Sequence, residues 1–232
     1  MKQSGGHLLE LEHGEQRAGD RAFIGGRPHL PPAVPLPVCL LCGEGLTFFF
    51  QVAFPPGHPW EGRQLALFAC TSCYDEDSVI PAMLDGPLAG ADVPSELIDR
   101  YQTNFRLIVS EAAHAVPRDD YEPRVAFRRL LLVAAEDAEE PRGKVGGEPV
   151  WILDDESPRS FDGTVPAVFL MQLDEGLHYA VLPGAPPQMT MTLFDGIQPS
   201  DEPSYTLFVD NGLYFFGSAA GRPLVYVLPQ GA

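Results

Sequence analysis

The four cysteines of this chain form two C-x-x-C pairs, and no other feature of the sequence constrains its fold as strongly. Cys39 and Cys42 make the first pair, and Cys70 and Cys73 make the second. Two apolar runs lie between the pairs, separated by the Pro/Gly-rich segment 55–59, and such runs are typical of β-strands. If these strands pair antiparallel, the start of the first lies beside the end of the second. We therefore expect four sulfurs at one end of a hairpin, an arrangement that suits tetrahedral zinc.

Other roles of the cysteines fit the sequence less well. Structural disulfides form in oxidising compartments, and residues 1–20 lack the apolar core of a secretory signal, which favours a cytoplasmic location. A thioredoxin-like redox pair would begin a helix, whereas both pairs here adjoin predicted strands. Gly43, directly after the first pair, suits a tight knuckle because glycine tolerates positive φ angles. The 27 residues between the pairs exceed the commonest zinc-ribbon spacing, and buried reduced thiols are the alternative.

The composition indicates a packed, β-rich chain with an acidic surface. Of the 232 residues, 45% are apolar, and the 24 prolines and 23 glycines favour many short strands joined by turns. The 15 basic and 32 acidic residues give a formal net charge of -17. Such a surface repels nucleic-acid phosphates and anionic membranes, whereas it attracts a basic protein. No apolar stretch reaches the length of a membrane-spanning helix.

The order of segments suggests two β-rich halves. Residues 1–21 are polar apart from one short apolar patch, which is typical of a flexible segment. A short helix is predicted from Ser95 to about Asn104, and 105–109 and 125–133 have the composition of strands, although the periodicity of the second segment also fits a helix. The expected division is a flexible N-terminal segment at 1–21, a first half at 22–134, an acidic linker at 135–144 and a second half at 145–232.

The start of the fold recurs later in the chain. A Gly-Gly-x-Pro turn at 25–28 has a counterpart at 146–149, an offset of 121 residues. Without a gap, the same offset aligns Gln51 with Gln172, each inside an apolar strand. This pattern predicts an internal duplication, although any two strand-turn units resemble each other in a β-rich chain.

The predicted second copy has lost all four cysteines. Their positions are taken by Ser160, Gly163, Ser218 and Gly221. Joint loss is expected of a metal site, because losing one thiolate removes most of the affinity and leaves the other three without a role. The second half is therefore expected to stabilise its hairpin by packing alone.

Several of these motifs together resemble a known family. They are the Gly-Gly-x-Pro turn, the C-x-x-C before the Phe-Phe-Gln strand, the Phe-x-Cys-x-x-Cys ending at Cys73, and the Gly-Gly-x-Pro-x-Trp ending at Trp151. From about Phe23 to Gly217 the chain resembles the YwqG-like proteins and the related programmed cell death protein two family. The resemblance implies a largely β, α+β fold with two pseudo-equivalent halves. The eukaryotic relatives escort a small-subunit ribosomal protein, but this chain lacks their second cysteine set, so that partner does not carry over.

Motifs of common enzymes do not occur in the sequence: there is no G-x-S-x-G, H-E-x-x-H, Walker loop or G-x-G-x-x-G. The six histidines are scattered. The acidic runs 75–77 and 154–156 lack the pattern of a calcium loop, and solvated loops are the simpler interpretation. Gln51 and Gln172, as polar residues in apolar strands, are expected to clamp the backbone of neighbouring loops.

These observations predict an α+β, predominantly β protein, stapled by zinc and without enzymatic activity. It would act as an interaction scaffold or dedicated chaperone that binds a basic polypeptide. The expected partner-binding residues are Trp151, Asp154, Asp155 and Glu156, which combine an aromatic side chain with negative charge. The alternatives are a hydrolase or transferase with a site between the halves, and an immunity-type inhibitor.

Overall fold

The computed structural model describes residues 6–84, 86–134, 136–137, 142–192 and 194–231, and it is mostly β-sheet, as the composition predicts. The strands are β1 (His7–Glu12), β2 (Ala22–Ile24), β3 (His29–Leu30), β4 (Thr47–Ala53), β5 (Arg63–Ala69), β6 (Asp92–Val93), β7 (Phe105–Glu111), β8 (Val116–Pro117), β9 (Arg128–Val133), β10 (Gly143–Val145), β11 (Ser160–Phe161), β12 (Val165–Leu173), β13 (Tyr179–Ala180), β14 (Met189–Thr192), β15 (Gly196–Pro199), β16 (Ser204–Tyr205), β17 (Gly212–Ser218) and β18 (Val225–Gln230). An α-helix, α1 (Ser95–Arg100), begins where the sequence predicts one, and 3-10 turns occupy Glu76–Ser78, Ala112–His114 and Phe208–Asp210. No helix among the described residues is long and apolar enough to cross a membrane.

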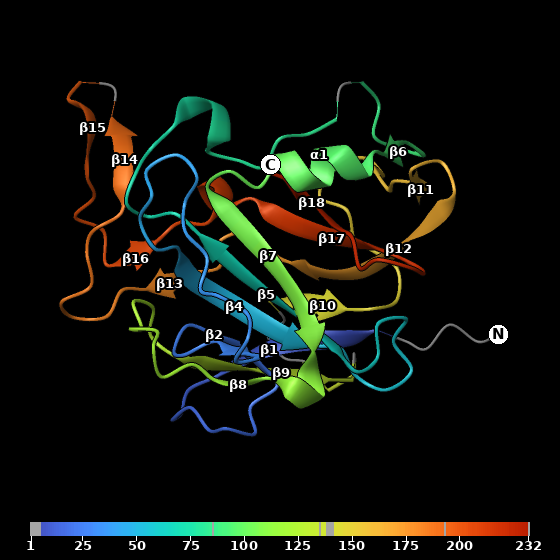
Figure 1. Ribbon diagram of the computed structural model, residues 1–232, viewed down its shortest axis with the longest axis horizontal. Coiled ribbons are helices and arrows are strands. Elements are labelled where there is room, and N and C mark those ends of the chain that lie inside the picture. The colour runs from blue at the N-terminus through green and yellow to red at the C-terminus, as the bar shows by residue number, and fades with distance from the viewer. Residues whose placement is uncertain (1–5, 85, 135, 138–141, 193, 232) are drawn as a thin grey trace.

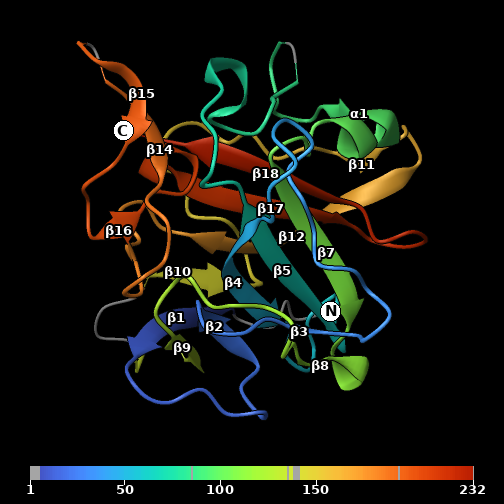
Figure 2. The same cartoon turned by 60° about the vertical axis from the view of Figure 1, so that its left-hand side comes forward.

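One twisted sheet organises the molecule. Its main path runs in the order β18-β17-β12-β10-β1-β9-β2-β4-β5-β7, and β11 and β6 extend it beside β12 (Figure 1). The twist brings the two end strands, β7 and β18, toward each other near α1 (Figures 1 and 2).

Side chains that follow α1 cap both open edges of this sheet. The hydroxyl of Tyr101 donates to the carbonyl of Val225 (3.2 Å) and accepts the N–H of Val227 (3.3 Å), both on β18. The amide oxygen of Gln102 accepts the N–H of Leu107 on β7 (2.6 Å). Backbone groups occupied in this way cannot pair with the edge of another chain.

Strand β4 forms the centre of the first half because its apolar sequence is continuous and both of its faces are buried. Phe48 belongs to a small cluster that includes Cys39, whereas Phe49 and Phe50 belong to the large core shared with the second half. A β-bulge between Phe48 and Phe50 in the pairing with β5 explains why two neighbouring residues both join the large core.

The ribbons β2–β4 and β10–β12 have the same register at the offset of 121 residues. Ile24 pairs with Phe50, and Val145 pairs with Met171. The pairing of β12 with β17 also carries a bulge, between Phe169 and Met171, where β4 has one between Phe48 and Phe50.

The Gly-Gly turns that follow β2 and β10 also agree in detail. The N–H of Gly25 donates to the carbonyl of Phe49 (2.9 Å), and that of Gly146 donates to Leu170 (2.8 Å). Both glycines have positive φ, 61° and 70°. A Cβ on Gly25 would lie 2.4 Å from a backbone oxygen, so the turn requires glycine there.

The two glutamines clamp the backbone of neighbouring segments, which are β3 for Gln51 and the loop at Val150 for Gln172. The amide oxygen of Gln51 accepts the N–H of His29 (2.9 Å), and that of Gln172 accepts the N–H of Val150 (2.7 Å). Gln51 also donates to Gln64 (3.0 Å), whose amide in turn donates to the carbonyl of His29 (2.6 Å). The first clamp is therefore a buried two-glutamine network.

The expectation of a flexible segment at 1–21 is wrong for residues 7–12. They form β1, which lies in the middle of the sheet between β10 and β9. Leu9 is fully buried, and Arg129 on β9 forms an ion pair with Glu12. The apolar patch is short, but it lies between β9 and β10 and packs on the large core. Residues 1–5 lie outside the described part of the chain.

The expected boundary between halves also needs correction. His7 of β1 pairs with Val145 of β10, so a strand of the expected N-terminal segment lies against the second half, whereas the pairing of Arg128 on β9 with Ile24 on β2 falls within the expected first half. Of the predicted acidic linker, residues 135 and 138–141 lie outside the described residues, while Gly143 and Lys144 belong to β10.

The loop between β4 and β5 docks on the second half. The indole N–H of Trp60 donates to the carbonyl of Ser218 (3.0 Å), and Trp60 is 1% exposed. His58 is also buried: its Nδ1 accepts the N–H of Trp60 (3.0 Å), so Nε2 carries the proton that it shares with the carbonyl of Leu170 (3.0 Å). Burial lowers the pKa of His58, which keeps this ring neutral.

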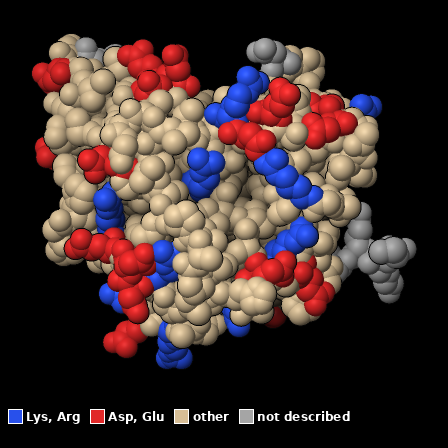
Figure 3. All heavy atoms as spheres, in the orientation of Figure 1, with Lys and Arg blue, Asp and Glu red and all other residues tan. Residues whose placement is uncertain are grey.

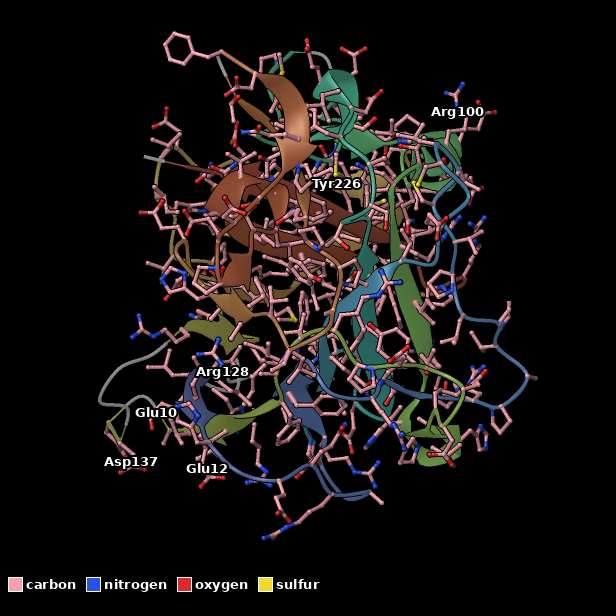
Figure 4. All side chains as sticks on the ribbon, turned by 90° about the vertical axis from the view of Figure 1, so that its left-hand side faces the viewer. Glu10, Glu12, Arg100, Arg128, Asp137 and Tyr226 are labelled. Atoms are coloured by element: carbon pink, nitrogen blue, oxygen red, sulfur yellow. The ribbon has the colours of Figure 1, made fainter. Side chains whose placement is uncertain are left out.

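Strands β14 and β15 form a separate two-stranded ribbon, which we call the arm (residues 189–199). In Figure 4, where the left side of Figure 1 faces the viewer, the arm rises clear of the main sheet at the top of the molecule. Its base is tied to the second cysteine pair, because the N–H of Met189 donates to the carbonyl of Thr71 (2.9 Å).

Candidate metal centre

The β4–β5 hairpin brings the four cysteines together, as the sequence predicts. Thr47 at the start of β4 pairs with Ala69 at the end of β5, so the chain enters and leaves the hairpin at the same end. Cys39 and Cys42 precede this end, and Cys70 and Cys73 follow it directly. We call these two short loops, residues 38–45 and 70–73, the knuckles.

The four sulfurs have the spacing of a tetrahedral metal site. The Sγ atoms all lie within 4.8 Å of one another. Cys39–Cys73 is 3.8 Å, Cys42–Cys70 is 3.7 Å and Cys70–Cys73 is 3.5 Å. Four sulfurs at the zinc–thiolate distance of about 2.3 Å would be separated by about 3.8 Å in an ideal tetrahedron. Disulfides need about 2.05 Å, and all four cysteines are free, so the donor set fits a zinc ion.

Each knuckle is fixed by its backbone. In the first, the N–H of Cys39 donates to the carbonyl of Glu44 (2.8 Å), and that of Gly43 donates back to Cys39 (2.9 Å). Gly43 has a φ of 79°, the conformation for which glycine was expected. In the second, the N–H of Ser72 points at the Sγ of Cys70 (3.4 Å), and such donors stabilise a thiolate.

The protonation of the thiols depends on their burial and on one another. Burial raises the pKa of the Cys70 thiol to about 11. Burial, and hydrogen bonds that hold the proton on its thiol beside Cys70 and Cys42, also raise the pKa of Cys73. For Cys42, burial opposes ionisation, but hydrogen bonds from the Glu44 backbone and the other thiols lower its pKa overall. Four thiolates so close together need a cation, and metal binding would release protons from the raised thiols.

The residues that the predicted duplication would place at the cysteine positions form hydrogen bonds. Asp92 accepts both the hydroxyl of Ser160 (2.8 Å) and the N–H of Gly163 (2.5 Å) through Oδ1. Ser218 closes the other loop by donating to the carbonyl of Arg222 (2.7 Å). The second half is therefore stabilised here by the carboxylate of Asp92 as well as by packing. The sequence analysis missed this carboxylate because Asp92, in β6, is distant in the chain.

Of the expected partner-binding residues, Asp154 and Asp155 are exposed, whereas Trp151 and Glu156 are partly buried. Trp151 is half-buried and stacks on Tyr214, with ring centroids 4.5 Å apart. Asp155 accepts the N–H of Ser157 (2.8 Å), and Glu156 accepts the side-chain amide of Gln230 (2.7 Å). Asp154 is exposed. Trp151 and two of the three carboxylates thus have structural contacts, which their sequence context did not reveal.

Negative charge is divided among several groups on the face in Figure 3. Basic side chains lie among acidic ones around a central hollow and below it. The upper left of the view, over the arm, displays acidic side chains and no basic ones. A pocket of about 270 Å³ adjoins Cys70 and Cys73. No local pattern of the sequence indicates this pocket, because its walls come from segments that are far apart in the chain.

A scan against models of known protein families finds no match for this chain, and a search of curated proteins finds none either. The resemblance to the YwqG-like proteins therefore stays a prediction from the motifs.

Proposed function

We propose that the protein binds one structural zinc ion through Cys39, Cys42, Cys70 and Cys73, and that the zinc-stapled sheet is a non-enzymatic scaffold or chaperone for a basic polypeptide. The observation that carries the metal assignment is the near-tetrahedral spacing of the four sulfurs. Catalytic zinc sites keep one position open for water or substrate, whereas four thiolates would complete the coordination shell. We therefore prefer a structural role over a hydrolase or transferase at this centre.

The basic client is supported by electrostatics. The net charge of -17 favours encounter with a cationic polypeptide and opposes binding of nucleic acid. A reducing location such as the cytoplasm would keep the thiols available for the metal.

We also propose that the fold arose by internal duplication, with β1 and β9 as equivalent first strands. Three features support this. The two ribbons share one register, and each has a glutamine clamp. In addition, His7 pairs with Val145, and the residues related to them by the offset of 121, Arg128 and Ile24, pair with each other. Membership of the YwqG-like family belongs to the same proposal.

Two measurements test the proposed function. Protein purified without chelator should contain about one zinc per chain by elemental mass spectrometry. Metal-free protein with an unchanged melting temperature would overturn the zinc assignment. Immobilised protein should capture basic polypeptides in preference to acidic ones of equal length, with slower association as salt increases. Equal capture of both would overturn the basic client.

A further inference from the structure

The pocket beside the metal centre, which we call the knuckle–arm pocket, has three walls. The second knuckle contributes Cys70, Cys73 and the adjoining Asp75, and the arm contributes Met189 and Met191. The turn Phe208–Asp210 forms the third wall. The pocket of about 270 Å³ has room for one large apolar side chain and is open to solvent on one side.

Apolar side chains are exposed around this pocket. Val209 is 58% exposed and Met191 46%, although both line it. Farther along the arm, Ile197 is 54% exposed and Phe194 is 94% exposed. Large apolar side chains gathered on one projecting element mark an interaction site rather than ordinary surface. Methionine adapts its shape to different apolar partners, which suits a pocket that receives a side chain.

The charge at the pocket has one sign. Asp75 and Asp210 line it, and no Lys or Arg is among the described residues of its walls. Glu76 and Asp77 are exposed directly beyond Asp75. This agrees with the corner of Figure 3 over the arm, where acidic side chains are not interspersed with basic ones. Burial raises the pKa of Asp210, so a cation close by would favour its ionised form.

The third wall is held in a conformation that its residues disfavour. Phe208, Val209 and Asp210 have φ angles of 49°, 61° and 58°, in the left-handed region. For β-branched Val209 this is a true outlier, and such backbone strain is concentrated at ligand clamps and functional loops. Asn211 holds the turn by donating its side-chain amide to the carbonyl of Phe208 (3.0 Å). The strain presents Val209 at the pocket.

We propose that the knuckle–arm pocket binds a basic segment of polypeptide, with one Leu, Phe or Met side chain in the pocket and flanking Lys or Arg side chains beside Asp75 and Asp210. This inference rests on the proposed function and gives the basic client a docking site. It replaces the loop at 154–156, where two carboxylates are already engaged.

The probe is a fluorescein-labelled dodecapeptide with Arg-Phe-Arg in a Gly-Ser background. Matched peptides carry Glu-Phe-Glu or Arg-Ser-Arg. The zinc-loaded protein is labelled with ¹³C at its five methionine methyl groups and titrated with each peptide. The Arg-Phe-Arg peptide should shift the signals of Met189 and Met191 and leave that of buried Met171 in place. The two matched peptides should bind more weakly.

A pair of charge variants locates the site. Asp75→Lys should weaken binding of the Arg-Phe-Arg peptide about five-fold, as measured by fluorescence anisotropy. Asp154→Lys makes the same change of net charge and should leave the affinity for this peptide unchanged. If Asp75→Lys lowers the melting temperature, Met191→Glu on the exposed arm replaces it, with exposed Leu153→Glu as its control.

The outcomes separate the two proposals. If the peptide binds but the signals of Met189 and Met191 stay in place, or if Asp154→Lys weakens binding as much as Asp75→Lys, the pocket is not the docking site and the basic client stands. If no basic peptide binds more tightly than its acidic counterpart, the proposed function itself fails.

Discussion

The indole ring of Trp60 occupies the space that any side chain at Gly217 would need. A Cβ at Gly217 would lie 2.5 Å from Cζ2 of Trp60. In the proposed duplication, the pairing of Thr47 with Ala69 would correspond to that of Val168 with Gly217. The first pair has an alanine, whereas the second has a glycine that faces the indole ring of Trp60.

Gly217→Ala should therefore destabilise the protein by about 1–3 kcal/mol, because a buried ring must move to admit one methyl group. Urea unfolding followed by tryptophan fluorescence measures this loss. Gly19→Ala is the control, since a Cβ there meets nothing within 4 Å. Equal stability of the two variants would mean that Trp60 does not pack on Gly217 in solution.

Loss of one thiol should affect the first half far more than loss of the Ser160 hydroxyl affects the second. Cys42→Ser should abolish stoichiometric zinc and lower the melting temperature several-fold more than Ser160→Ala, which removes a hydrogen bond worth about 1 kcal/mol. Calorimetry and metal analysis of the same samples measure both effects. Similar melting temperatures for the two variants would contradict a stabilising metal.

The ion pair between Asp20 and Arg129 should make stability depend on pH. Burial by itself would raise the pKa of Asp20, but hydrogen bonds from Arg129 (2.8 Å) and the backbone of Arg17 (2.7 Å) lower it below its usual value. The contribution is complete above the unfolded-state pKa of about 3.9 and is lost as pH falls through the folded-state value.

Asp20→Asn should therefore lower the unfolding free energy by about 1–2 kcal/mol at neutral pH. The difference from wild type should shrink as unfolding is measured from about pH 5 down to about pH 2. Asp119→Asn, at an exposed pair with Arg27, serves as the control and should have little effect. A difference for Asp20→Asn that is independent of pH would contradict the lowered pKa.

The two glutamine clamps should differ in strength. Gln51→Leu leaves the N–H of His29 without a partner in a buried place, so it should cost about 2–3 kcal/mol. Gln172→Leu frees the N–H of Val150, whose residue is 62% exposed, and water can replace the amide at a cost of about 1 kcal/mol or less. Chemical denaturation of both variants tests this order, and a larger loss for Gln172→Leu would reverse it.

Much of the first half could be predicted from local pattern. The cysteine spacing, the apolar runs and the glycine after Cys42 act within one hairpin, so they specify the cluster of four cysteines before any long-range contact is known. The glutamines at 51 and 172 were equally informative, because a polar side chain in a buried strand must find a partner.

What could not be predicted depends on contacts between distant segments. Residues 7–12 have only three leucines to indicate a strand, and their place in the sheet is set by β9 and β10, more than 100 residues away. An extension of the 121-residue offset to the N-terminus would have aligned Leu9 with Leu130 and indicated β1. Asp92 and the knuckle–arm pocket have no comparable local signal.

Because β1 lies between β10 and β9, and β9 lies between β1 and β2, the sheet needs strands from both parts of the chain for its assembly. A fragment that ends before β9 would leave β2 without a neighbour on one side, and a fragment that begins at β9 would lack the strand that covers β10. The two fragments, produced as separate chains, would each present the unpaired edge that the other fills. Mixing them should restore the continuous sheet by complementation, in the manner of a domain-swapped dimer.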